Sequence, residues 1–111
     1  MKLNEKVDNI RGRLVKKYGV HTTSYYPVRV WTRGDGVRYK EPNYLESTQD
    51  IFSALNDMLP NARKIQVRGE FGSSSYDDAL IHNQVVYINR GPVVTFATTS
   101  ILKNTAIWNT K

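Results

Sequence analysis

Residues 47–71, STQDIFSALNDMLPNARKIQVRGEF, contain the pattern of a helix followed directly by the pattern of a strand. Ser47 is a residue type that caps helices, and Asp50 stands three positions later, as in a capping box. The apolar residues of one helix face follow, namely Ile51, Phe52, Leu55, Met58 and Leu59. Pro60 then ends the helix, and from Lys64 to Phe71 apolar and polar residues alternate, as in a half-buried strand. A helix beside a strand predicts an α+β domain.

A second helix is predicted near the N-terminus, from Leu3 to Tyr18. Apolar residues recur there at helical spacing, and Gly19 is the residue type that terminates helices. A rotation of about 100° per residue places five cations on one flank of the apolar stripe, with Glu5 and Asp8 towards the other. The five cations are Lys2, Lys6, Arg13, Lys16 and Lys17. The positive charge of this helix is therefore sorted to one side.

The C-terminal half of the chain is predicted to be mostly strand. Beyond a polar surface loop at residues 72–78, β-branched and apolar runs predict three strands, at residues 79–82, 85–88 and 93–99. The second of these runs is apolar on both faces, which is typical of a central strand. The tail at residues 101–111 fits a short helix, a strand or a loosely docked arm.

These elements predict an α+β fold in which two helices cover one face of an antiparallel sheet of about five strands. The chain has 111 residues, which is the size of one typical domain. We therefore expect residues 1–111 to form a single small domain.

A basic hairpin is the first candidate binding surface. Residues 25–33 and 37–40 are expected to pair as its two strands, joined by Gly34-Asp35-Gly36. If two residues form the turn, one face carries Arg29, Trp31, Arg33, Arg38 and Lys40. Cations beside an aromatic ring are typical of nucleic-acid surfaces, although cations also protect solvent-facing strands from edge-to-edge pairing.

The overall charge favours a polyanionic partner. Sixteen Lys and Arg against ten Asp and Glu give a net charge of +6. Lys6, Arg13 and Lys17 on the N-terminal helix form the second candidate surface, although such a charge run is often simply solvated. The chain has no cysteine and no apolar run of about 20 residues, so we expect a cytoplasmic protein without a membrane partner.

Catalytic chemistry is not indicated by the sequence. His21 and His82 have no partner at metal-ligand spacing. Glu70, Asp77 and Asp78 are close in sequence and in principle suit the divalent metal of a nuclease, but acids in a Ser-rich stretch are more typical of a turn. We therefore expect no catalytic residue, no metal and no cofactor.

The function predicted from these features is non-catalytic binding of DNA or RNA, mainly through phosphates. The alternative is a small regulator or inhibitor that grips an acidic protein surface with basic and aromatic residues, for which we consider a viral or mobile-element origin. A homodimer through an edge strand or through the C-terminal arm with Ile107 and Trp108 is a further hypothesis.

Overall fold

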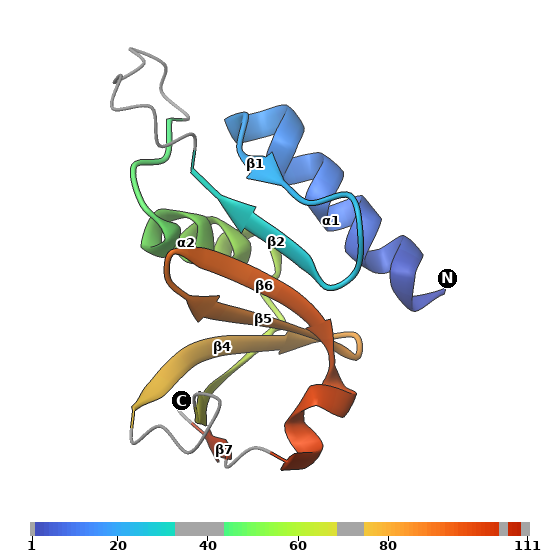
Figure 1. Cartoon of the computed structure of the whole chain (residues 1–111), viewed down its shortest axis with the longest axis vertical. Helices are drawn as coiled ribbons and strands as arrows, with labels where there is room; N and C mark the ends of the chain where they lie inside the picture. Colours follow the sequence, from blue (N-terminus) through green and yellow to red (C-terminus); the bar gives the residue numbers. More distant parts are fainter. Residues whose placement is uncertain (1, 33–43, 69–74, 105–106, 110–111) are drawn as a thin grey trace.

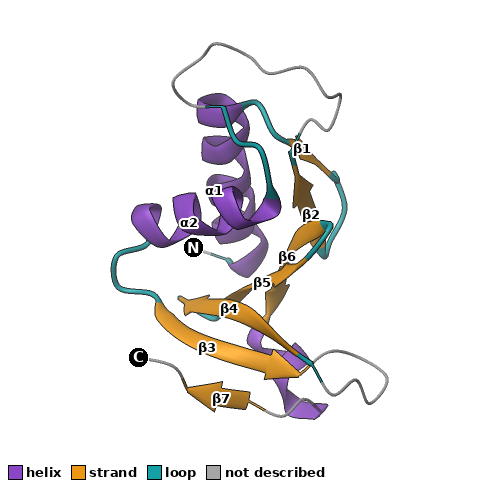
Figure 2. Ribbon diagram, turned by 90° about the vertical axis from the view of Figure 1, so that its left-hand side faces the viewer, coloured by secondary structure: helices purple, strands orange, loops and turns teal. Residues whose placement is uncertain are grey.

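The computed structural model describes residues 2–32, 44–68, 75–104 and 107–109. Its elements, in chain order, are α1 (Leu3–Tyr18), β1 (His21–Thr22), β2 (Val28–Trp31), α2 (Thr48–Met58), β3 (Arg63–Arg68), β4 (Tyr76–His82), β5 (Val85–Arg90), β6 (Val93–Thr98), the 3₁₀ helix η1 (Thr99–Asn104) and β7 (Ile107–Asn109). The strands form one antiparallel sheet in the order β1-β2-β6-β5-β4-β3-β7 (Figure 1 and Figure 2).

The predicted α+β class is confirmed, with seven strands among the described residues in place of about five. The two strands at the edges of the sheet, β1 and β7, are only two and three residues long. Segments this short carry no period of their own, so the hydrophobic pattern does not predict them.

Helix α1 has the predicted bounds. Its apolar stripe is buried through Val7, Ile10 and Leu14. Gly19 adopts a left-handed conformation with φ of 66°, and its N–H donates to the Val15 carbonyl at 2.8 Å, which satisfies one carbonyl of the last turn.

Helix α2 begins with the predicted capping box. The Ser47 hydroxyl accepts from the Asp50 N–H at 3.3 Å, and the Asp50 carboxylate accepts from the Ser47 N–H at 3.1 Å. Ile51 and Leu55 are fully buried on the inner side of the helix.

Both helices lie on the same side of the sheet (Figure 2). Beneath them, Leu80, Tyr87 and Phe96 project from neighbouring strands into one apolar core with the helix stripes. A smaller apolar cluster on the opposite side of the sheet includes Val86 and Ile88, and residues Ile101 and Leu102 of η1 pack against it. Strand β5 is buried on both faces and lies in the middle of the strand order, which confirms the predicted central strand.

The polar loop predicted at residues 72–78 is wrong for its last part, because Tyr76 to Asp78 belong to β4. These residues pair with β3, with Tyr76 opposite Arg68 and Asp78 opposite Gln66. Pairing to an existing strand overrides the weak strand propensity of Asp. Residues 72–74 lie outside the described residues.

Strand β2 pairs differently from the predicted hairpin. Val30 lies opposite Thr22 of β1 on one side and Val94 of β6 on the other, so both backbone edges of β2 are occupied at this point. The pairing predicted with residues 37–40 therefore does not extend to Val30, and residues 37–40 themselves lie outside the described residues.

The C-terminal tail combines two of the three predicted possibilities, a short helix and a strand. Strand β7 pairs antiparallel with β3 of the same chain, with Ile107 opposite Val67. A homodimer through this arm stays a prediction.

Candidate nucleic-acid interface

Two of the predicted hairpin residues lie on the side of the sheet opposite the helices. Arg29 and Trp31 alternate along β2 with Val28 and Val30, which are buried in the core beneath the helices. Arg29 is exposed, and the half-buried Trp31 ring stacks on His21 with a centroid distance of 5.8 Å. The remaining hairpin candidates, Arg33, Arg38 and Lys40, lie outside the described residues.

The two flanks of α1 face different parts of the molecule. On the flank without the five cations, Arg11 donates to the Thr23 carbonyl at 3.0 Å, next to β1, and to Asp8 at 2.7 Å. On the other flank, the Lys6 ammonium lies 3.5 Å from the Asn83 carbonyl, in the turn between β4 and β5. Four of the cations, Lys6, Arg13, Lys16 and Lys17, therefore lie on the flank of α1 that faces away from β1, and Lys2 precedes the helix as its N-cap. We call this set of five residues the α1 basic flank.

The structure does not bring the two predicted surfaces together. Arg29 and Trp31 are on the far side of the sheet, whereas Lys6, Arg13 and Lys17 are on a helix that packs on its near side. One ligand strand cannot contact both sets without passing around the sheet.

The cations of the α1 basic flank are not neutralised within the described part of the chain. Arg13 and Lys17 are exposed and form no ion pair there, and Lys17 lies 5.4 Å from the centre of the Tyr18 ring. By contrast, Arg11 pairs with Asp8 and Arg90 pairs with Asp77. The flank therefore presents free positive charge to solvent.

A small cavity of about 160 Å³ opens beside this flank, between α1 and the turn that joins β4 to β5. It is lined by Lys6, Asn9, Ile10, His82, Asn83, Val85 and Tyr87. The turn itself has positive φ at both central residues, 50° at Asn83 and 68° at Gln84, which is the geometry of a tight type I′ hairpin. This turn brings Asn83 close to the side chain of Lys6.

The phenol of Tyr87 stays protonated at physiological pH. Burial, together with the smaller effect of the nearby Tyr26 hydroxyl, raises its pKa to about 12. The Tyr87 hydroxyl is therefore a neutral hydrogen-bonding group.

Sequence reasoning missed the cavity residues, apart from Lys6. Asn9, His82 and Tyr87 belong to three different elements, and no local spacing relates them. Only the packing of α1 against β5 makes them neighbours.

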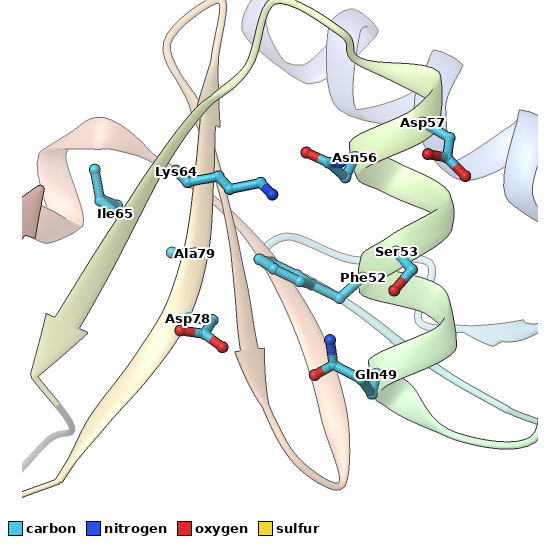
Figure 3. Close-up of a pocket in the computed structure, with 9 residues that line it drawn as sticks. All are labelled: Gln49, Phe52, Ser53, Asn56, Asp57, Lys64, Ile65, Asp78 and Ala79. Carbon is cyan, nitrogen blue, oxygen red and sulfur yellow. The ribbon is translucent and has the colours of Figure 1, made fainter. Parts of the chain in front are cut away.

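A larger groove lies elsewhere, between α2 and strands β3 and β4, with a volume of about 420 Å³ (Figure 3). In Figure 3, Lys64 extends from the sheet toward α2, the Phe52 ring lies between the two walls, and Asp78 projects from β4. Asp57 adds a second carboxylate from α2. Two carboxylates against one ammonium make this groove unfavourable for phosphate.

A third hollow, of about 400 Å³, lies on the other side of α2 and extends to Tyr18 at the end of α1. Its acidic lining residues are Glu46, Asp50 and Asp57. The surface around α2 is thus acidic. This acidic surface begins where the α1 basic flank ends, near Tyr18 at the C-terminal end of α1.

Among the residues that the structure describes, no group of three or more His, Cys, Asp and Glu could hold a metal ion. In the same residues, no helix is long and apolar enough to cross a membrane.

Comparisons with models of known protein families, with curated proteins and with solved structures found no match.

Proposed function

We propose that this protein binds nucleic acid without catalysing a reaction on it, and that the α1 basic flank contacts the phosphates. The observation that carries this proposal is the sorting of five cations onto one exposed helix flank of a chain with a net charge of +6. A nucleic-acid backbone is the common cellular ligand with closely spaced negative charges in a row.

The dimensions of the flank suit such a ligand. From Lys2 to Lys17 the helix axis covers about 22 Å, at 1.5 Å per residue. Several consecutive phosphates of one strand fit along this length, because the charge spacing of a nucleic-acid strand is only a few ångströms. A nucleic-acid strand is not expected to continue along the surface past Tyr18, because the acidic surface around α2 repels its phosphates.

A cytoplasmic location belongs to the same proposal. It is supported by the lack of cysteine, because a chain that forms no disulfide does not need an oxidising compartment.

A second candidate function is binding of another protein through the surface around β1 and β2. The observation that favours it is a group of accessible aromatic rings near β1 and β2: Tyr25 is 63% exposed, Tyr26 is 44% exposed, and Trp31 stacks on His21. Tyr and Trp are the residues that most often anchor protein interfaces. With Arg29 beside them, this surface suits an acidic partner, as expected of a small regulator or inhibitor.

The test is a fluorescence-anisotropy titration of labelled DNA and RNA oligonucleotides at low and at physiological salt. The test variant is Arg13→Gln/Lys17→Gln, which removes two cations of the α1 basic flank. The matched control is Arg29→Gln/Arg63→Gln, which removes two exposed cations from the side of the sheet opposite the helices. Both variants carry the same net charge, so a difference between them reports the location of the site.

We expect the α1 variant to bind about tenfold more weakly than the wild type and the control to bind nearly normally. Equal weakening of both variants would show that net charge alone drives binding. Loss of binding in the control only would move the site to the Arg29 side. No binding to any oligonucleotide would reject the proposal and favour the protein-binding function.

A further inference from the structure

We infer that the cavity between α1 and the β4–β5 turn receives one unpaired nucleobase, so that the protein prefers single-stranded to double-stranded nucleic acid. This inference rests on the proposed function, because it names the form of nucleic acid that the same surface binds. Three observations support it: the walls of the cavity, its rim, and its position on the α1 basic flank.

The inner walls of the cavity are apolar. Ile10, Val85 and the ring of Tyr87 form them, and all three side chains are buried in the core. The Tyr87 ring is held in place by an edge-to-face contact with Phe96, with a centroid distance of 4.8 Å. Apolar walls favour the flat face of a heterocyclic ring and offer nothing to a bare phosphate ion.

The rim of the cavity carries groups that match the edge of a base. Asn9 and Asn83 are exposed amides, each with both hydrogen-bond donors and an acceptor, and His82 is a half-buried imidazole. Unpaired bases in protein sites are bound through their hydrogen-bonding edges and through contacts with aromatic rings. The cavity therefore combines polar groups at its rim, which can bond the edge of a base, with an apolar floor.

The size of the cavity limits the ligand. A volume of about 160 Å³ is below the range of about 300–1,000 Å³ typical of pockets for drug-sized molecules. A single base fits this space better than a whole nucleotide, whose sugar and phosphate would remain outside.

Lys6 links the cavity to the phosphate surface. It lines the cavity and also belongs to the α1 basic flank, with Arg13 about two turns further along the same flank. A strand that follows this flank thus passes the mouth of the cavity. In a duplex the bases are paired and stacked, and extrusion of one base opposes binding, whereas a single strand presents its bases freely.

The experiment compares three labelled ligands of about twelve nucleotides, a length within the site sizes of single-strand-binding domains. They are a single strand, the same strand with abasic residues at its central positions, and the duplex. The abasic strand keeps every phosphate, so it separates base recognition from charge. Wild type is compared with Asn9→Ala/His82→Ala, which removes two rim side chains.

The control variant is Asn4→Ala/Asn61→Ala. It removes two exposed amides, on α1 and in the turn before β3, that do not line the cavity. Thermal unfolding of both variants verifies that they are folded.

We expect wild type to bind the single strand about tenfold more tightly than the abasic strand and the duplex. The Asn9→Ala/His82→Ala variant should lose this preference and keep its salt-dependent binding, while the control variant behaves as wild type. Equal, salt-dependent binding of all three ligands by wild type would overturn the base site and leave phosphate binding intact. No binding of any ligand would overturn both.

Discussion

At the scale of single residues, Ser47 has a defined energetic role. Its hydroxyl and the Asp50 carboxylate satisfy each other's backbone N–H groups at the start of α2. Ser47→Ala removes one of these hydrogen bonds, and we expect it to lower the free energy of unfolding by about 1 kcal/mol in urea denaturation. Ser53→Ala is the matched control, an exposed serine of the same helix without a capping role, and should change stability by less than about 0.5 kcal/mol. Equal losses in the two variants would contradict the capping role.

Tyr87 gives a second prediction at this scale, a pH dependence of stability. Burial raises its pKa in the folded state to about 12, above the value near 10 expected in the unfolded chain. The folded protein then holds the phenolic proton more tightly, so the stabilisation is complete below about pH 10 and is lost as the pH rises towards 12. Partial burial also raises the pKa of Tyr26, and a hydrogen bond to Thr98, which lowers the pKa, offsets only part of this effect.

The measurement is the free energy of unfolding at several pH values between 9 and 12, for wild type and for Tyr87→Phe. Wild-type stability should decline with a slope of up to about 1.4 kcal/mol per pH unit for this one group. The Tyr87→Phe variant should show a shallower decline. An identical decline in both proteins would mean that Tyr87 does not contribute.

At the scale of elements, two glycines have opposite effects on α1, one inside the helix and one directly after it. Gly12 lies in the helix interior, and a Cβ atom placed there meets no atom within 4 Å. Gly12→Ala should therefore stabilise the protein by about 1 kcal/mol through helix propensity. Gly19 follows the helix with φ of 66°, so Gly19→Ala should destabilise it by about 1 kcal/mol or more. Thermal or urea unfolding of the two variants measures whether each change raises or lowers stability. If both changes shifted stability in the same direction, the helix end at Tyr18 would be contradicted.

At the scale of the whole molecule, the opposite charges of the two helices determine how binding responds to salt. The α1 basic flank has five cations, so it supplies at most five phosphate contacts. The acidic surface around α2 adds none. Three to five contacts with a single strand predict a slope of about −2 to −3.5 in a plot of log K against log salt concentration.

The salt slope also identifies which cations take part. Arg13→Gln/Lys17→Gln should make the slope shallower by about 1.4, whereas Arg29→Gln/Arg63→Gln should leave it unchanged. A slope that does not change in the α1 variant would place the phosphate contacts elsewhere.

The sequence by itself determined the features that depend on near neighbours. Helix α1, with its end at Gly19, follows from the spacing of apolar residues and from one glycine, and helix α2 follows from its capping box. The central position of β5 follows from a run that is apolar on both faces. These signals lie within a few residues of one another, where helix and strand periodicity is expressed.

Only the tertiary structure decided which surfaces meet. Strand β2 pairs with β6, so Val28 lies opposite Phe96, and this places Arg29 and Trp31 on the side of the sheet away from α1. The cavity beside Lys6 exists because α1 packs next to the turn at Asn83. Such contacts join residues far apart in the chain. They form because they bury the apolar core as a whole, and no pattern within a few residues of sequence predicts them.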